Sequence, residues 1–307
     1  MNDTPLVFWI GFNLFVLAML ALDLGVFNRR AHVVGMREAL GWSAVWVALA
    51  MVFNGFIYWW HGARPATEFF TAYLLEKALS VDNLFVFALL FAQFRIPAES
   101  QHRVLFWGIL GALVMRALFI ATGVTLVAKF HWMIPLFGVF LIFTGIKMGL
   151  AKDSDADPAA GWFGRWVRRR LPVSDRLDGQ RFWTRVDGRR LATPLLLVLV
   201  LIEFTDVLFA LDSIPAVLAV TRDPFIVYTS NIFAILGLRA LYFALAGVMR
   251  KFHLLHYALA FILVFIGGKM VAELWLHLPV FASLAVIAMS LALAVGGSLL
   301  RPEKRAA

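Results

Sequence analysis

Acidic residues interrupt several segments of this chain that are otherwise apolar over about twenty residues. They are Asp23, Glu76, Asp82, Glu203, Asp206 and Asp212. An acidic residue at the centre of a membrane-spanning helix costs about 2.5–3.5 kcal/mol on insertion scales, so it is normally paired, hydrated or functional. Carboxylate oxygens are the ligands that hard divalent cations such as Mg²⁺, Ca²⁺ and Mn²⁺ prefer. These residues therefore indicate a cation site within a membrane domain.

Helical spacing predicts which of these acids share a cavity. On an unbroken helix, Glu76, Ser80 and Asn83 lie on one face, because residues at i, i+4 and i+7 align. A second helix presents one face that holds Glu203, Asp206, Ala210 and Ser213. Asp82 and Asp212 lie about 120° round from these faces. Both sets can therefore line one cavity.

Two residues modify this interpretation. Pro215 removes the backbone hydrogen bond to residue 211, so the helix is predicted to bend or open just before Asp212 and to free carbonyl ligands there. Asp23 lies near the inner end of its apolar segment and can reach headgroup water. We interpret it as a structural residue rather than a ligand.

Basic residues inside the apolar segments are the expected partners of the acids. Arg116 and Arg239 lie at mid-helix, and Lys77 follows Glu76 directly. These three bases can neutralise three of the five midspan acids, which leaves about two carboxylates for one divalent cation. Lys147 and Lys269 lie near the ends of their segments, so they are expected to extend to the membrane interface.

The composition excludes several classes of protein. The chain is 62% hydrophobic and 15% charged, against about 45–50% and about 25% in soluble domains. It has no cysteine, which excludes disulfides, thiol catalysis and thiolate metal sites on this chain. The net charge of +9 is a topology signal in a membrane protein, so we predict no nucleic-acid binding. We also predict that the protein is not an enzyme.

Nine hydrophobic spans predict an all-α, polytopic membrane protein with one transmembrane domain over residues 1–300. They cover 6–27, 39–60, 69–94, 103–127, 130–150, 193–220, 225–249, 252–272 and 278–300. Twenty Lys and Arg residues fall in one set of alternating loops, and only Arg64, Lys129 and Arg222 fall in the other. The positive-inside rule then places the N-terminus outside and the C-terminus, with the tail 301–307, in the cytoplasm. The expected location is the plasma (inner) membrane.

The polar segment 151–192 is the expected cytoplasmic loop, and it contains many arginines with interspersed tryptophans. Such a segment can bind anionic lipid headgroups. A solvated loop whose charges only establish topology is the interpretation we favour.

An internal repeat relates the spans. Residues 129–148 match 251–270 at an offset of 122, and Arg116 matches Arg239 at 123. Further upstream, the segment from Glu76 matches the segment from Asp206 at an offset of 130. The repeats, residues 69–150 and 193–272, begin on opposite sides of the membrane by the loop count, so they are predicted to be inverted. Inverted three-helix repeats are typical of transporters, whose substrate site lies at the repeat interface.

These segments resemble the TerC family of membrane proteins, and most closely its Alx branch. The resemblance rests on residues 73–83, 203–206, 211–216, 223–227 and 229–240. The family name comes from tellurium resistance, and Alx has also been labelled a redox modulator, but the resemblance implies manganese export. The implied acidic metal ligands are Glu76, Asp82, Glu203, Asp206 and Asp212. The implied neutral ligands are Asn83, Ser213 and Asn231.

We therefore expect a nine-span exporter of Mn²⁺ that works by alternating access, with Glu76, Asp82, Asp206 and Asp212 as first-choice ligands. Mn²⁺ is the substrate rather than a cofactor, and protons are the expected exchanged ion. Two rival functions stay open. An exporter of amino acids or of an oxyanion such as tellurite would need cationic groups free in the cavity. A membrane stress scaffold would use the buried charges only to hold helices together.

Overall fold

The structure is a computed structural model of the whole chain, described here over most of its length. The described residues are 4–22, 35–130, 132–150, 166–167, 169–174, 177–186, 189–245, 254–272 and 279–300. Within the helices, the side chains of residues 81, 82, 85, 128, 245 and 299 lie outside this description. Asp23 falls between the described ranges.

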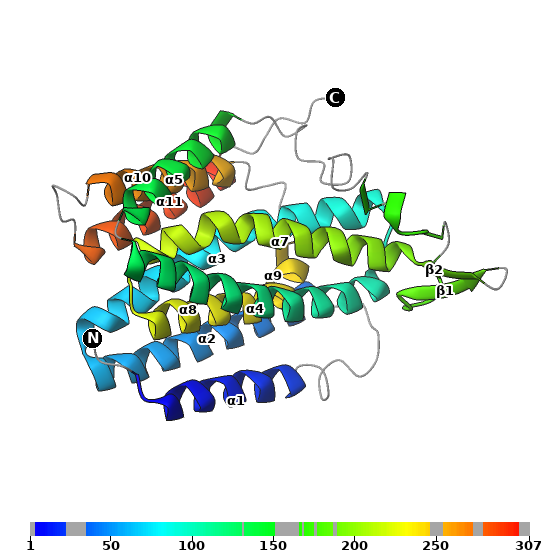
Figure 1. Cartoon of the computed structure of the whole chain (residues 1–307), viewed down its shortest axis with the longest axis horizontal. Coiled ribbons are helices and arrows are strands. Elements are labelled where there is room, and N and C mark those ends of the chain that lie inside the picture. Colours follow the sequence, from blue (N-terminus) through cyan, green and yellow to red (C-terminus); the bar gives the residue numbers. More distant parts are fainter. Residues whose placement is uncertain are drawn as a thin grey trace.

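Ten helices and two short strands make up the described residues (Figure 1). The helices are α1 (Leu6–Leu22), α2 (Met36–His61), α3 (Ala63–Gln93), α4 (Ala98–Lys129), α5 (Met133–Leu150), α7 (Pro194–Leu218), α8 (Pro224–Leu236), α9 (Leu238–Leu245), α10 (Leu255–Ala272) and α11 (Val280–Leu300). The strands are β1 (Trp183–Val186) and β2 (Arg189–Ala192). The protein is thus a mainly helical, multi-pass membrane protein.

Seven stretches of helix among the described residues are long and apolar enough to cross a membrane unaided, and one of them combines α8 and α9. The remaining helices of the predicted spans are α1, which has 17 described residues, and α3, which has 31. α3 is long enough, but Glu76, Lys77 and Asp82 lie close together within it. Nine crossings therefore stay a prediction, and α3 requires partners for its charges.

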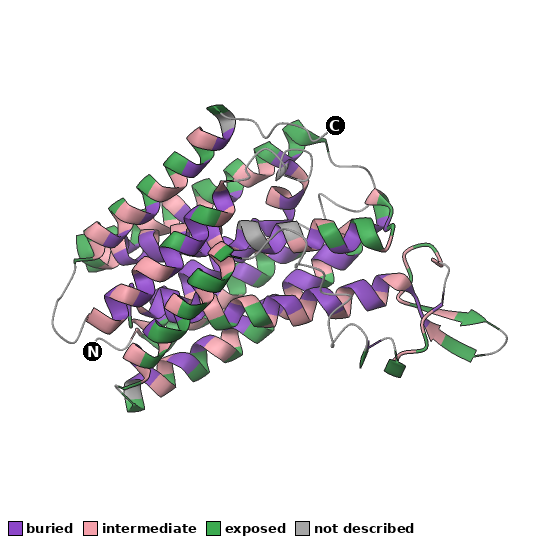
Figure 2. Cartoon of the chain, turned by 90° about the horizontal axis from the view of Figure 1, so that it is seen from above, coloured by how far each residue is buried: buried purple, intermediate pink, exposed green. Residues whose placement is uncertain are grey.

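The helices form two groups that pack against each other (Figure 1). α5, α10 and α11 lie together at one side, and the remaining helices run side by side, with α3 and α7 nearest to that group. Most residues of the stretch Pro224–Ala244, which covers α8 and most of α9, are buried, whereas few residues of α2 and α11 are. Figure 2 shows this contrast as purple interior helices and green outward faces. α8 is therefore a central helix surrounded by protein.

α5 and α10 pack at unusually short range. A Cβ atom added to Gly138 would lie 2.7 Å from the carbonyl oxygen of Gly267, and one added to Gly145 would lie 2.7 Å from that of Ala260. Because the later residue of α5 meets the earlier residue of α10, the two helices run antiparallel. Glycines allow this approach of one backbone to another, as in other membrane helix pairs.

The predicted opening of the helix before Pro215 does not occur. α7 continues through Pro215 to Leu218. The interruption lies instead in the next span, where α8 ends at Leu236 and α9 begins at Leu238, with Gly237 between them. Pro215 removes only the hydrogen bond to the carbonyl of residue 211, and the loss of this one bond does not end α7.

The loop 151–192 contains a small sheet, so the all-α prediction does not extend to it. β1 and β2 pair antiparallel, with Trp183 opposite Ala192 and Val186 opposite Arg189. The dipeptide Asp187-Gly188 lies between the strands in the sequence, and such dipeptides favour tight hairpin turns. That signal could have predicted the hairpin.

Candidate functional site

Arg116 joins acidic residues from both repeated segments. Its guanidinium, on α4, forms an ion pair with Glu76 of α3 and a second with Asp206 of α7, at 3.3 Å between Nη2 and Oδ1. Nη1 also donates to the hydroxyl of Ser213 at 3.0 Å and to Oδ1 of Asn231 at 3.2 Å. Side chains from α3, α4, α7 and α8 therefore meet at one guanidinium, and we call these five residues the arginine cluster.

The arginine cluster is almost dry. Arg116 is 1% exposed, Glu76 0% and Asp206 4%. The amide of Asn231 donates to Oε2 of Glu76 at 3.1 Å, which gives this carboxylate a second partner. Breaking a buried ion pair by removing one partner typically costs about 3–5 kcal/mol, because the other charge is left uncompensated. The cluster therefore depends on its charges being matched.

Local sequence signals position Asn231 in this cluster. α8 begins after Asp223, whose carboxylate accepts hydrogen bonds from the backbone N–H groups of Phe225 and Ile226 at 2.9 and 3.2 Å. Pro224 occupies the first helical position, where its missing N–H costs nothing. The start of α8 is thereby defined, and two turns later Asn231 faces Glu76 and Arg116.

Hydrogen bonding in and beside the cluster is incomplete. Among the described residues, Oδ2 of Asp206, Nε of Arg116 and the hydroxyl of Ser80 are buried without a hydrogen-bond partner. Ser80 lies one turn after Glu76 on α3 and is 1% exposed. Most buried polar atoms in proteins have a partner, so these atoms mark a place where hydrogen-bonding or ligating capacity is unused.

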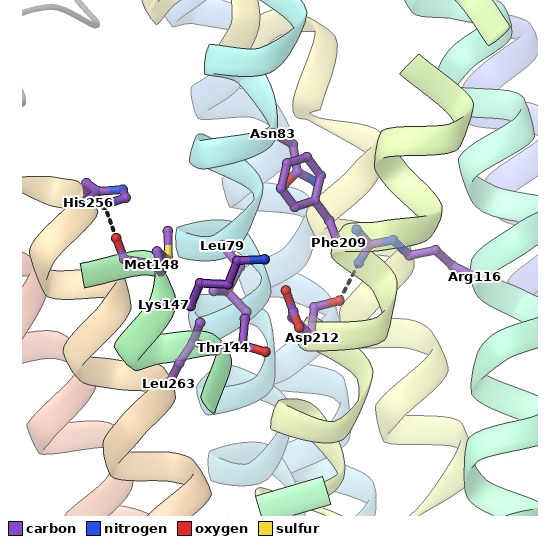
Figure 3. Close-up of a pocket in the computed structure, with 11 residues that line it drawn as sticks. Leu79, Asn83, Arg116, Thr144, Lys147, Met148, Phe209, Asp212, His256 and Leu263 are labelled. Atoms are coloured by element: carbon purple, nitrogen blue, oxygen red, sulfur yellow. Dashed lines mark hydrogen bonds between the residues drawn. The ribbon is translucent and has the colours of Figure 1, made fainter. Parts of the chain in front are cut away.

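A pocket of about 270 Å³ adjoins the arginine cluster. It lies where α3, α4, α5, α7 and α10 meet, and Figure 3 shows the side chains that point into it. Its polar lining includes Asn83, Arg116, Thr144, Lys147, Asp212 and Ser213. Arg116 and Ser213 belong to both the pocket and the cluster, so the two are continuous.

Asp212 faces the polar side chains of α5 across the pocket. It lies beside Thr144 and close enough to Lys147 for electrostatic attraction (Figure 3). We expected Lys147 to extend to the membrane interface; its side chain is exposed and also lines the pocket. Lys269 differs from that expectation, since it is 8% exposed and donates to the carbonyl of Ala219 and to the hydroxyl of Ser283.

Glu203, another predicted ligand, is not gathered with these residues. Glu203 packs against α4, where its carboxylate occupies the space that a side chain at Gly111 would need. Asp82 lies on α3, but its side chain is outside the described part. Across the described side chains, no group of three or more His, Asp or Glu residues is arranged to hold a metal ion. The Arg116 guanidinium is the cationic group that contacts both Glu76 and Asp206.

Lys77 has a different partner from the one predicted. Its ammonium donates to the carbonyl oxygen of Ala234 at 2.9 Å, rather than to a carboxylate among the described residues. That carbonyl belongs to the last turn of α8, where the interruption at Gly237 leaves acceptors unused and the helix dipole favours a cation. Lys77 thus caps α8. Arg239, on α9, is buried at 8% exposure.

Comparison with known proteins identifies the family. The model of the integral membrane protein TerC family matches residues 61–306, which include the arginine cluster and the whole pocket. The chain belongs to the TerC family. No solved structure matches the chain.

Two relatives illustrate how closely the chain resembles other TerC proteins. An uncharacterized membrane protein of Myxococcus xanthus is 54% identical over 293 residues, 95% of this chain and 92% of the relative. Alx of Escherichia coli (strain K12), named as a proposed membrane-bound redox modulator, is 49% identical over 294 residues, 92% of this chain and 91% of the relative. The similarity thus extends over nearly the entire length of this TerC protein.

Proposed function

We propose that this TerC protein exports a divalent cation, most favourably Mn²⁺, from the cytoplasm by alternating access. The observation that carries the proposal is the convergence of Glu76 and Asp206 on one buried guanidinium, beside a pocket that Asp212 lines. Glu76 and Asp206 correspond to each other in the two repeated segments. A structural ion pair has no need for two equivalent acids next to a cavity, whereas a substrate site at a repeat interface does.

The packing of α5 against α10 supports the inverted relation of the repeats. Under the offset of 122, Gly138 corresponds to Ala260 and Gly145 corresponds to Gly267. Gly138 packs on Gly267, and Gly145 packs on Ala260. If each residue is replaced by its equivalent in the other repeat, the contact of Gly138 with Gly267 becomes the contact of Ala260 with Gly145. A two-fold axis between antiparallel helices requires this relation. We propose that this axis relates the two repeats and that the pocket lies at their interface.

The chemistry of the site favours a hard cation over the rival substrates. Carboxylate, amide and hydroxyl oxygens from Asp212, Asn83 and Ser213 line the pocket, and such oxygens suit Mn²⁺, Mg²⁺ and Ca²⁺. The choice of Mn²⁺ among these rests on the family resemblance. An oxyanion exporter would need cationic groups available to the substrate. Of the two cationic side chains named above in the pocket, the Arg116 guanidinium is engaged by two carboxylates, and Lys147 lies close enough to Asp212 for electrostatic attraction. Thiol redox chemistry is excluded on this chain, since it has no cysteine.

We further propose that export is coupled to an exchange for protons. Carboxylates bind either a metal ion or protons, so Mn²⁺ and protons compete for the same oxygens. A site that releases Mn²⁺ outside and returns with protons neutralises its acids in both directions of the cycle. The proposed orientation, with the loop 151–192 in the cytoplasm, makes this cycle an export.

Flux measurements in proteoliposomes test the proposal. The purified protein should move Mn²⁺ across the vesicle membrane, and Asp212→Asn should abolish this flux while the protein still inserts and purifies. The matched control is Asp178→Asn, the same change in the loop, where Asp178 contacts only Thr184 and Arg181 among the described side chains. Flux of amino acids or tellurite without Mn²⁺ flux would support the first rival, and no flux at all would support the scaffold.

A further inference from the structure

We infer that Arg116 is a tethered counter-cation, which occupies the place of the substrate between the two equivalent acids and is displaced when the substrate binds. This inference rests on the proposed function and assigns a role to one residue of the same site. Its starting point is geometric. The guanidinium lies between carboxylates contributed by the two repeated segments, Glu76 on α3 and Asp206 on α7, where an ion shared by both repeats would lie.

The arginine cluster does not share the symmetry of its acids. Glu76 and Asp206 are equivalent, but the arginine that joins them comes from the first repeated segment alone. Its equivalent, Arg239, lies on α9 and is not one of the residues that line the pocket. Arg116 is thus a single side chain that bridges two equivalent acids without an equivalent partner of its own. We therefore interpret it as a group bound at the site of these acids.

The charges of the cluster match a divalent ion better than they match arginine. Two carboxylates carry two negative charges, and one guanidinium compensates one of them. Replacing the guanidinium by a divalent cation removes the excess charge, which is costly in a dry interior. The two carboxylates therefore favour a divalent cation over a monovalent cation in the place of the Arg116 guanidinium.

The cluster is also built so that it can open. Nε of Arg116 and Oδ2 of Asp206 have no hydrogen-bond partner among the described residues, so less is lost on separation than in a fully satisfied pair. Arg116 lines the pocket, which gives the guanidinium space to move into.

Mn²⁺ binding to the purified full-length protein in detergent tests the inference, with free Mn²⁺ measured by electron paramagnetic resonance. Arg116→Gln removes the competing charge and keeps a side chain that can bond Ser213 and Asn231. It should bind Mn²⁺ on the order of tenfold more tightly than the wild type. Arg116→Lys keeps the charge but cannot bridge two carboxylates in the same way, so its affinity should lie between the two. Arg64→Gln is the matched control, since Arg64 has an 86% exposed side chain and pairs with Glu68 at the start of α3.

Thermal unfolding provides the second measurement. Without metal, Arg116→Gln should unfold at a lower temperature than the wild type, because two buried carboxylates lose their cation. Added Mn²⁺ should raise its unfolding temperature more than that of the wild type. If Arg116→Gln does not fold without metal, recovery of folded protein on purification with Mn²⁺ supports the same conclusion.

These measurements distinguish failure of the inference about Arg116 from failure of the proposed function. If the wild type binds Mn²⁺ and folded Arg116→Gln binds it equally or more weakly, Arg116 is not a competitor for the site, and the inference is wrong while the proposed function stands. If neither the wild type nor any variant binds Mn²⁺, the proposed function fails and the inference fails with it.

Discussion

The packing of α5 on α10 yields a sharp prediction because two adjacent glycines lie in opposite environments. A Cβ atom at Gly267 would overlap the carbonyl oxygen of Gly138 and lie 2.9 Å from the backbone nitrogen of Ile142. A Cβ atom at Gly268, the next residue, would meet nothing within 4 Å. The same substitution, Gly→Ala, should therefore have opposite effects at the two positions.

The expected magnitudes follow from these contacts. At Gly267 the obstacle is backbone on a facing helix, so α5 and α10 must move apart, and overpacking of this kind costs about 1–3 kcal/mol. At Gly268 alanine only improves the helix propensity, which is worth about 1 kcal/mol. The variants Gly267→Ala and Gly268→Ala should thus differ by about 2–4 kcal/mol in free energy of unfolding.

Unfolding in detergent by a graded denaturant series measures this difference on the two purified variants side by side. The transport assay should show the same order, because the pocket lies between this helix pair and α3, α4 and α7. Equal stability of the two variants would mean that α5 and α10 do not approach each other at Gly267. The contact that supports a two-fold relation of the repeats would then be lost.

Three further predictions follow from other parts of the molecule. Lys77→Gln should destabilise the protein by about 1.5–3 kcal/mol, because the last turn of α8 loses a charged donor to Ala234, and hydrogen exchange at the end of α8 should increase. In proteoliposomes, Mn²⁺ binding should weaken as pH falls and an inward proton gradient should accelerate export; transport that ignores the gradient would contradict proton exchange. The chain has no cysteine, so single cysteines can be introduced to test the orientation. Ala63→Cys should react with an impermeant thiol reagent from outside the cell, and Arg181→Cys should not. The reverse labelling would invert the proposed orientation.

Properties that depend on local composition were accessible from the sequence alone. Apolar length and low charge identify a multi-pass membrane protein, since a helix of about twenty apolar residues is required to cross the bilayer. The cost of burying charge in a membrane singles out Glu76, Asp206, Asp212 and Arg116 as residues that need a partner or a function. Helical periodicity also places Glu76 and Asn83 on one face of α3.

The partners of these charges were decided only by tertiary structure. Arg116 and Asn231 are 115 residues apart, and Lys77 meets a carbonyl 157 residues away. Such contacts depend on how each helix is rotated and shifted against its neighbours, which is set by the packing of side chains over the whole bundle and leaves no periodic trace in the sequence. For the same reason the sequence could not tell that Lys147 turns into the pocket, that Lys77 caps α8, or that Glu203 lies against α4 at Gly111.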